Sequence, residues 1–173
     1  FSQPMVEAQA SIPNGGFNGT YLGDVSAEAY LDHQEKAIII SGQAIDSTKH
    51  KVVQVQGKVI PATRWWGLDI TCDSVDIGLI DFWTNGFFSN PQGRAYGNLK
   101  VFGQEQQVWV LADVLGKNTQ LTVPQLGSTF YFSDTIHMDS TSIRIPKLDV
   151  YDAVGNKGTF EGIITHDKFT KIG

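Results

Sequence analysis

Hydrophobic and polar side chains alternate with a period of two along most of this chain. The clearest stretch is 65–73, where Trp66, Leu68, Ile70 and Cys72 alternate with polar residues and glycine. Successive side chains of a β-strand point to opposite faces of the sheet, so this pattern predicts strands with one apolar and one polar face. Six long strands are predicted in this way, at 20–31, 51–60, 65–73, 94–101, 107–115 and 158–166.

Shorter apolar stretches predict further strands at 37–45, 120–123, 128–133, 141–145 and 148–151. The segments between the strands are rich in Gly, Asn, Asp, Ser and Pro, which favour tight turns. Turns are expected at 46–49, 90–93, 116–118 and 153–156. Strands of this length joined by short turns predict a mainly antiparallel meander.

One segment, 75–88, breaks the period of two. Hydrophobic residues from Val75 to Trp83 recur near helical spacing, and Asn85-Gly86 supplies a helix stop. We expect either one short amphipathic helix here or a loop with buried aromatic side chains.

The architecture is an all-β fold whose strands each need a cover for their apolar face. One short helix at most is available for this, so three arrangements remain: two packed sheets, a closed barrel, or one sheet curled into a trough. The apolar faces are rich in Val, Ala, Gly and Ile. Small side chains leave space between the walls, which makes a lined cavity or groove plausible.

Composition agrees with this picture and excludes several classes of protein. The chain has 173 residues, 41% hydrophobic and 18% charged, with 18 Gly and a formal net charge of −5. This suits one β-rich domain, and the acidic balance argues against a nucleic-acid partner. No apolar run of about 18 residues exists. The start, Phe1-Ser2, carries neither an initiator Met nor a basic leader, which indicates a processed or excised chain.

Metal and thiol chemistry find little support in the sequence. Cys72 is the one cysteine, so it forms no internal disulfide and no thiolate metal site alone, and we interpret it as a small buried hydrophobe. The four histidines, at 33, 50, 137 and 166, show no metal-ligand spacing. Residues 149–156 faintly resemble a calcium loop but lack its terminal Glu, which favours a hairpin turn.

Catalytic motifs are also missing. Asp69 and Asp73 share the polar face of one strand and Asp24 and Glu28 that of another, but nothing brings such a pair together across a cleft, as a glycosidase requires. The sequence has no Gly-x-Ser-x-Gly and no phosphate-binding loop. Asn18-Gly19-Thr20 matches a glycosylation sequon. The chain is therefore expected not to be an enzyme and to need no cofactor.

The aromatic residues offer an alternative function. Trp and Tyr side chains on an exposed sheet face can stack against sugars, although aromatics are common in strands anyway. A sandwich or calycin-like module that binds a carbohydrate or a small apolar ligand is therefore the alternative. The candidates are Trp65, Trp66, Trp83, Trp109, Tyr21, Tyr30 and Tyr96.

Three segments together carry a family resemblance. They are 19–29, 75–103 and 150–169, in which Gly-, Asn- and Asp-containing turns separate strands in a characteristic order and spacing. In these features the chain resembles the TamB family of translocation and assembly module proteins, as found in Bacteroidetes. The resemblance extends over most of residues 19–170.

The resemblance implies a fold, a location and partners. TamB-like proteins, related to the AsmA-like bridge proteins, are long periplasmic chains anchored in the inner membrane. They form a strongly curved, mainly antiparallel sheet, a trough with an apolar interior (a β-taco). They work with an Omp85-type outer-membrane barrel and serve phospholipid transport, barrel assembly or both. By this resemblance 19–170 is one groove segment, 1–18 an N-terminal extension and 171–173 a tail.

The apolar strand faces and the family resemblance together predict an apolar groove for phospholipid acyl chains, without a catalytic site. Apolar contact supplies about 0.8 kcal/mol per buried CH₂. The residues expected to line the groove are Val25, Ala27, Ala29, Val53, Val55, Trp66, Leu68, Ile70, Cys72, Ala95, Leu99, Val101, Val108, Val110, Ala112, Phe160 and Ile164.

Overall fold

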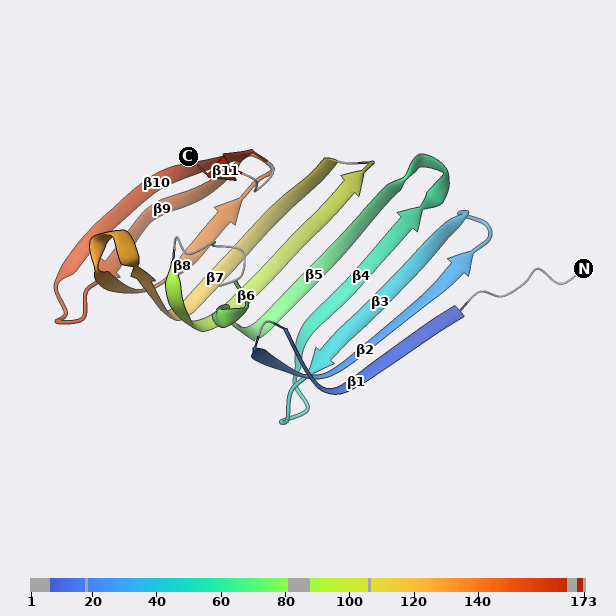
Figure 1. Ribbon diagram of the computed structural model, residues 1–173, viewed down its shortest axis with the longest axis horizontal. Coiled ribbons are helices and arrows are strands. Elements are labelled where there is room, and N and C mark those ends of the chain that lie inside the picture. The colour runs from blue at the N-terminus through green and yellow to red at the C-terminus, as the bar shows by residue number, and fades with distance from the viewer. Residues whose placement is uncertain (1–6, 18, 81–87, 106, 168–170, 173) are drawn as a thin grey trace, which may run out of the picture.

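The chain folds into one antiparallel meander. The computed structural model describes residues 7–17, 19–80, 88–105, 107–167 and 171–172. In the described residues every strand pairs with the strands before and after it in the sequence (Figure 1). The strands are β1 (Glu7–Phe17), β2 (Thr20–Asp32), β3 (Ala37–Ile45), β4 (Lys51–Ile60), β5 (Trp65–Asp76), β6 (Ser89–Gln104), β7 (Gln107–Val123), β8 (Ser128–Met138), β9 (Ser142–Tyr151), β10 (Lys157–Asp167) and β11 (Lys171–Ile172).

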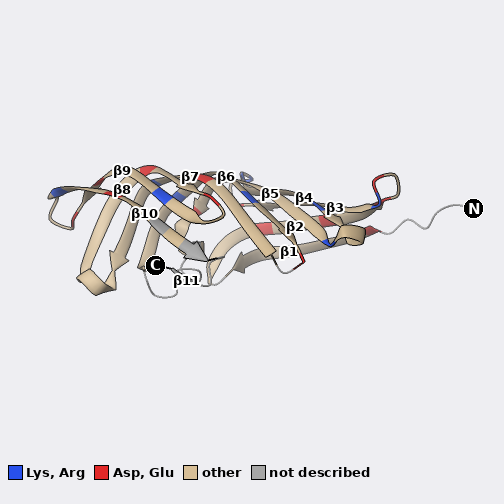
Figure 2. Cartoon of the chain, turned by 90° about the horizontal axis from the view of Figure 1, so that it is seen from above, with Lys and Arg blue, Asp and Glu red and all other residues tan. Residues whose placement is uncertain are grey.

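The sheet is open and forms a single layer. The order β1 to β11 leaves β1 at one edge and the two-residue β11 at the other, and the two edges do not pair. No second sheet packs on it within the described residues, which excludes a sandwich or a closed barrel for that part of the chain. The all-β, mainly antiparallel architecture predicted from the alternation is confirmed. Acidic and basic residues are spread along the strands and turns from one end of the sheet to the other (Figure 2).

Most predicted strands lie where the alternation places them. Residues 37–45 and 51–60 match β3 and β4. The stretches 107–115 and 120–123 form the single strand β7, and the other long strands extend beyond their predicted limits. The expected breaks at 90–93 and 116–118 are wrong, because β6 and β7 continue through them. Their extra residues are absorbed as bulges, at which the pairing register of the two strands shifts. A paired strand tolerates such insertions because its neighbours hold it on both sides.

Two more bulges, between β9 and β10 and between β5 and β6, alter the strands expected from the local pattern. The stretches 141–145 and 148–151 form the single strand β9, with a register shift against β10 at Pro146–Lys147. A bulge accommodates proline, which has no N–H for the ladder. In β5 the bulge places Ser74 at φ 69°. The Ser74 carbonyl accepts a hydrogen bond from Arg94 Nη1 at 3.3 Å, and Tyr96 Oη donates to Ser74 Oγ at 3.2 Å.

The one predicted helix is only partly described. Val75 and Asp76 belong to β5, so the helix prediction is wrong there. Ile77–Ile80 form the 3₁₀ turn η2, while 81–87 lie outside the described residues. The Asp76 carboxylate starts this turn by accepting the Gly78 N–H at 2.8 Å. Two other 3₁₀ turns, η1 (Pro61–Thr63) and η3 (Pro124–Leu126), connect strands.

Residues 7–17, within the stretch expected to be an extension, form the edge strand β1. It pairs with β2 from Glu7↔Tyr30 to Phe17↔Thr20, with bulges near Gly15. On one side of β1 lie Ala8, Ala10 and Ile12, which form a weak apolar alternation with the polar residues between them.

The core of this sheet is small. Ala44, Val52 and Val75 form one buried cluster, against which Leu22, Val25, Leu79 and neighbouring side chains pack. No large side chain among the described residues is fully buried. A single layer leaves one side of each strand without a packing partner, so most apolar side chains remain half-buried. This is the feature of the fold that bears most directly on function.

Candidate functional site

The candidate site is the apolar face of the sheet, which we call the inner face. Directly opposite residues of antiparallel strands project to the same side, so the register shows which residues share a face. One row crosses β1 to β10 without a polar side chain. It consists of Ala10, Ala27, Gly42, Val55, Ile70, Leu99, Ala112, Met138, Ile143 and Ile164.

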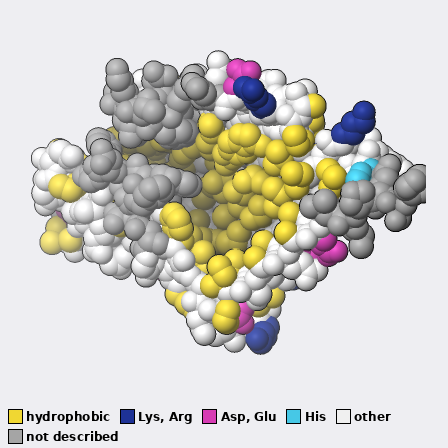
Figure 3. Space-filling model, turned by 45° about the vertical axis from the view of Figure 1, so that its right-hand side comes forward, with side chains coloured by type: hydrophobic (Ala, Val, Ile, Leu, Met, Phe, Trp, Pro, Cys, Tyr) yellow, Lys and Arg dark blue, Asp and Glu magenta, His cyan; other side chains and the backbone are white. Residues whose placement is uncertain are grey.

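Two neighbouring rows carry the same chemistry. On one side, Ala29, Ile40, Gly57, Leu68, Val101 and Val110 align. On the other side, Val25, Ala44, Val53, Cys72, Gly97, Val114 and Ile136 align. Together the rows make a continuous apolar surface, and Figure 3 shows hydrophobic side chains gathered over a hollowed part of the molecule with charged groups at its margin.

All of the residues predicted to line a groove occupy positions on this face. Trp66 and Val108 align through Gly103, and Ala95 pairs with Val75. Phe160 pairs with Leu148, and Ile164 with Ile143, although the Ile164 side chain lies outside the description. The set as a whole is half-buried. The extremes are Ala112 at 8% exposed and, toward the strand ends, Val108 at 40% and Phe160 at 49%.

On the inner face, two glycines lie beneath large side chains of the neighbouring strands. The Leu68 side chain lies over Gly57, and the Trp66 indole lies over Gly103. A Cβ at either glycine would meet these side chains at less than ordinary contact distance. The glycines therefore make room for their bulky neighbours, and the result is a broad surface without a deep, enclosed pocket at these positions.

One end of the inner face is covered by the connection after β5. Leu79 packs against the Ala44 cluster, and Ile77 is 7% exposed and lies near Gly116 of β7. The Gly78 backbone approaches Thr20 of β2. This connection therefore reaches across the inner face between strands that are far apart in the sheet.

The opposite face, which we call the outer face, carries polar side chains that pair with one another across strands. Lys100 Nζ lies 3.5 Å from Asp69 Oδ1, and Thr71 Oγ1 donates to Asn98 Oδ1 at 3.1 Å. His50 pairs with Asp73 at 3.0 Å. Asp69 and Asp73, two of the carboxylates considered for catalysis, are thus engaged by exposed partners. Exposed pairs of this kind stabilise a protein by about 1 kcal/mol or less.

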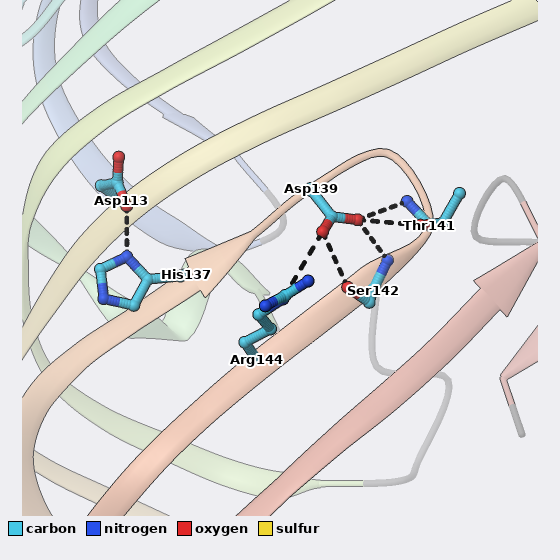
Figure 4. A network of polar contacts seen from close by, with 6 residues as sticks. All are labelled: Asp113, His137, Asp139, Thr141, Ser142 and Arg144. Atoms are coloured by element: carbon cyan, nitrogen blue, oxygen red, sulfur yellow. Dashed lines mark hydrogen bonds and ion pairs between the residues drawn. The ribbon is translucent and has the colours of Figure 1, made fainter.

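A second polar network ties the β8–β9 turn to the outer face (Figure 4). His137 contacts Asp113 across β7 and β8. Asp139 accepts hydrogen bonds from the Thr141 and Ser142 N–H groups at 2.9 and 2.8 Å and from both hydroxyls, with Arg144 Nε at 3.8 Å. The bond from the Thr141 N–H contributes most to holding the pKa of Asp139 well below its usual range. Both carboxylate oxygens of Asp139 are therefore occupied in closing the β8–β9 turn.

The residues considered for a calcium loop, a metal site or a reactive thiol have structural roles. Residues 149–156 form the β9–β10 hairpin, in which Asp152 accepts hydrogen bonds from the Val154 and Asn156 N–H groups and from Asn156 Nδ2. These bonds, that of the Asn156 side chain first, lower the pKa of Asp152. Among the described residues, no three His, Cys, Asp or Glu side chains converge as a metal site. Burial raises the pKa of the Cys72 thiol on the inner face.

The aromatic candidates divide between the two faces. Trp66 belongs to the inner face, whereas Trp65 lies on the outer face over Gly67, next to Phe102. Phe102 stacks on Trp109, with ring centroids 5.6 Å apart. Tyr96 lies on the outer face under Lys117 Nζ, 4.6 Å from the ring centroid. Trp83 and the sequon residue Asn18 fall outside the described residues.

Several inner-face residues were missed by the sequence analysis. Ile38 and Ile40 of β3 and Phe130, Phe132 and Ile136 of β8 share the face with the predicted set. In β8 these residues alternate with Tyr131, Ser133, Thr135 and His137, which is a signal that identifies them, whereas the apolar run Ile38-Ile39-Ile40 in β3 shows no alternation.

Compared with known proteins, the chain matches no family model, no curated protein and no solved structure. Among the described residues, no helix has the length and apolar character needed to cross a membrane.

Proposed function

We propose that this chain is a non-enzymatic segment of a periplasmic, TamB-like envelope protein whose inner face takes up phospholipid acyl chains. The observation that supports this is the uninterrupted apolar row from Ala10 to Ile143 across nine neighbouring strands. A face of this kind without a covering layer is uncommon, since soluble proteins rarely expose large contiguous apolar surfaces unless they bind something there.

The proposal includes the finer geometry expected of the family. In the full-length protein the sheet curls into a trough, with the inner face concave and the paired polar groups outside. The edge strand β1 allows the sheet to continue into a neighbouring segment of the full-length protein. Along its free edge the backbone N–H and C=O groups are unpaired and can bond to another strand. The full-length protein is anchored in the inner membrane and works with an Omp85-type barrel.

Transfer along such a face is passive. Each buried CH₂ contributes about 0.8 kcal/mol wherever the chain lies, so neighbouring positions have similar free energies. Acyl chains form no hydrogen bonds, so the half-buried Val, Ala and Ile side chains hold them through apolar contact alone. This is the physical reason for assigning a conduit to the inner face instead of a reaction.

The direct test is to purify the chain from bacterial membranes and identify co-purifying lipids by mass spectrometry. Titration of the delipidated chain with a fluorescent acyl phospholipid then measures affinity. We expect phospholipid to co-purify in preference to free sugars, and the titration to saturate. Absence of both co-purifying lipid and saturable binding contradicts the proposal.

A carbohydrate-binding role is the second candidate, supported by one feature of the outer face. The Phe102–Trp109 stack adjoins a shallow depression of about 300 Å³, lined in part by Asp69, Asn98 and Asp113. Aromatic rings beside such polar groups suit a sugar ring. Retention on polysaccharide columns that Trp109→Ala abolishes, together with no lipid binding, would favour this function over the first.

A further inference from the structure

The inner face contains one charged side chain at a paired position between β2 and β9. Asp134 of β8 lies directly opposite Gly116 of β7, with Ile136 two residues further along opposite Val114. A Cβ at Gly116 would point toward Ile77 Cδ1, which lies on the inner side. Asp134 therefore projects to the same side as the apolar rows, where every other paired position carries an apolar or small neutral residue.

The Asp134 carboxylate is half-buried and only locally bonded. Its Oδ1 accepts the N–H of the next residue, Thr135, at 2.7 Å. Within the described residues no Lys, Arg or His forms an ion pair with it. A charged group in an apolar setting is costly unless it is paired, so Asp134 is a position that an incoming cation would stabilise.

A second polar group beside Asp134 lacks a partner. Thr119 is 2% exposed, and its Oγ1 has no hydrogen-bond partner among the described residues. This hydroxyl lies directly over Gly116, the residue paired with Asp134. Buried polar atoms in proteins almost always find a partner, so an unpartnered hydroxyl next to an unpaired carboxylate marks this as an unsatisfied polar position on the inner face.

The sheet is also open next to Asp134. Strands β8 and β9 pair at Tyr131↔Tyr151 and again at His137↔Arg144, and no residues between these points pair. Asp134 lies at the middle of the unpaired stretch of β8. A ligand group that binds at Asp134 would therefore not have to break backbone hydrogen bonds between β8 and β9.

We propose that Asp134 receives the ammonium group of an amine-bearing lipid whose acyl chains lie on the inner face. This inference rests on the proposed function and names its substrate class: phospholipids with an amine headgroup, in preference to those whose headgroup is anionic and lacks an amine. An ammonium supplies both the positive charge and the N–H donors that an acceptor-only carboxylate requires. A headgroup without an amine brings its phosphate charge toward Asp134 uncompensated.

The experiment compares phosphatidylethanolamine with phosphatidylglycerol of identical acyl chains, each titrated into the full chain in detergent below its micellar concentration. Tryptophan fluorescence reports binding. We expect the amine lipid to bind about five- to tenfold more tightly, a difference that corresponds to roughly 1–1.4 kcal/mol. Asp134→Asn, nearly identical in shape, should remove this preference, and 0.5 M salt should weaken it in the wild-type chain.

Asp113→Asn is the matched control, because Asp113 lies on the adjacent strand with its carboxylate on the outer face. It should keep the wild-type preference. Equal affinity of the wild-type chain for both lipids, or an unchanged preference in Asp134→Asn, overturns the headgroup assignment and leaves the acyl groove intact. If neither lipid binds at all, the proposed function fails. Should Asp134→Asn not fold, the wild-type comparison and its salt dependence still decide the question.

Discussion

A charge placed in the middle of the inner face should abolish lipid uptake without unfolding the sheet. Val110 pairs with Val101 on that face, one row from the uninterrupted row of Leu99 and Ala112. Val110→Arg would place a guanidinium and its hydration water where an acyl chain would lie. Because the face is open, the arginine stem can extend toward solvent, which limits the effect on folding.

The size of the effect follows from the contacts that an acyl chain would lose. If the hydrated guanidinium displaces two or three methylenes, the loss is about 1.6–2.4 kcal/mol at roughly 0.8 kcal/mol each. This corresponds to a weakening of roughly 15- to 60-fold in Kd. Leu111→Arg is the matched control, since Leu111 is the next residue in the chain, 41% exposed and on the outer face. An exposed substitution of this kind changes free energies by about 0.5 kcal/mol, or roughly twofold.

The assay is titration of both variants with a fluorescent acyl phospholipid, after circular dichroism and urea unfolding have shown that each is folded. Val110→Arg should bind at least tenfold more weakly than Leu111→Arg. In cells, the full-length protein with Val110→Arg should fail to restore envelope integrity, whereas Leu111→Arg, and likewise Asp113→Arg on the same outer face, should restore it. Equal lipid affinity of Val110→Arg and Leu111→Arg would refute the reasoning and make the inner face merely a structural surface.

Three further predictions concern stability and reactivity. Gly97→Ala should lower the free energy of unfolding in urea by about 1–3 kcal/mol, because Gly97 has φ +149° and an added Cβ would meet the Asp113 carbonyl oxygen. Gly127→Ala is the control: Gly127 has φ +60° but nothing lies within 4 Å of an added Cβ, so the cost should be about 1 kcal/mol. The pKa of Asp139 is lower in the folded than in the unfolded chain, so its stabilisation is fully present above about pH 4 and is lost as the pH falls further. The decline of stability below pH 4 should therefore be shallower in Asp139→Asn; identical acid-unfolding curves would exclude this role. The Cys72 thiol, whose pKa is raised by burial, should react slowly with a disulfide reagent at pH 8 and more slowly still with lipid bound; no protection by lipid would place the acyl chains elsewhere.

The strands and their faces could be predicted from the sequence because both are local properties. The alternation in 65–73 or 51–60 depends only on successive side chains pointing to opposite sides. Once a strand is recognised, its apolar face follows, and this is why residues as distant as Val25 and Val110 were assigned to one set. β1 was missed because Ala and Gln give its alternation little contrast. The helix expected from 75 failed at its start because pairing with β6 carries β5 on to Asp76.

What the sequence by itself determined is thus the strand class and the side on which each residue lies. The tertiary structure decided the register that aligns Ala10, Ala27 and Ile70 in one row, and the bulges that carry β6, β7 and β9 through expected breaks. It also decided that the sheet stays open, and that Asp134 falls among apolar neighbours beside Thr119. Register depends on cross-strand pairs far apart in the chain, and closure depends on twist summed over all strands. Neither the register nor the closure of the sheet can be predicted from the local period of two.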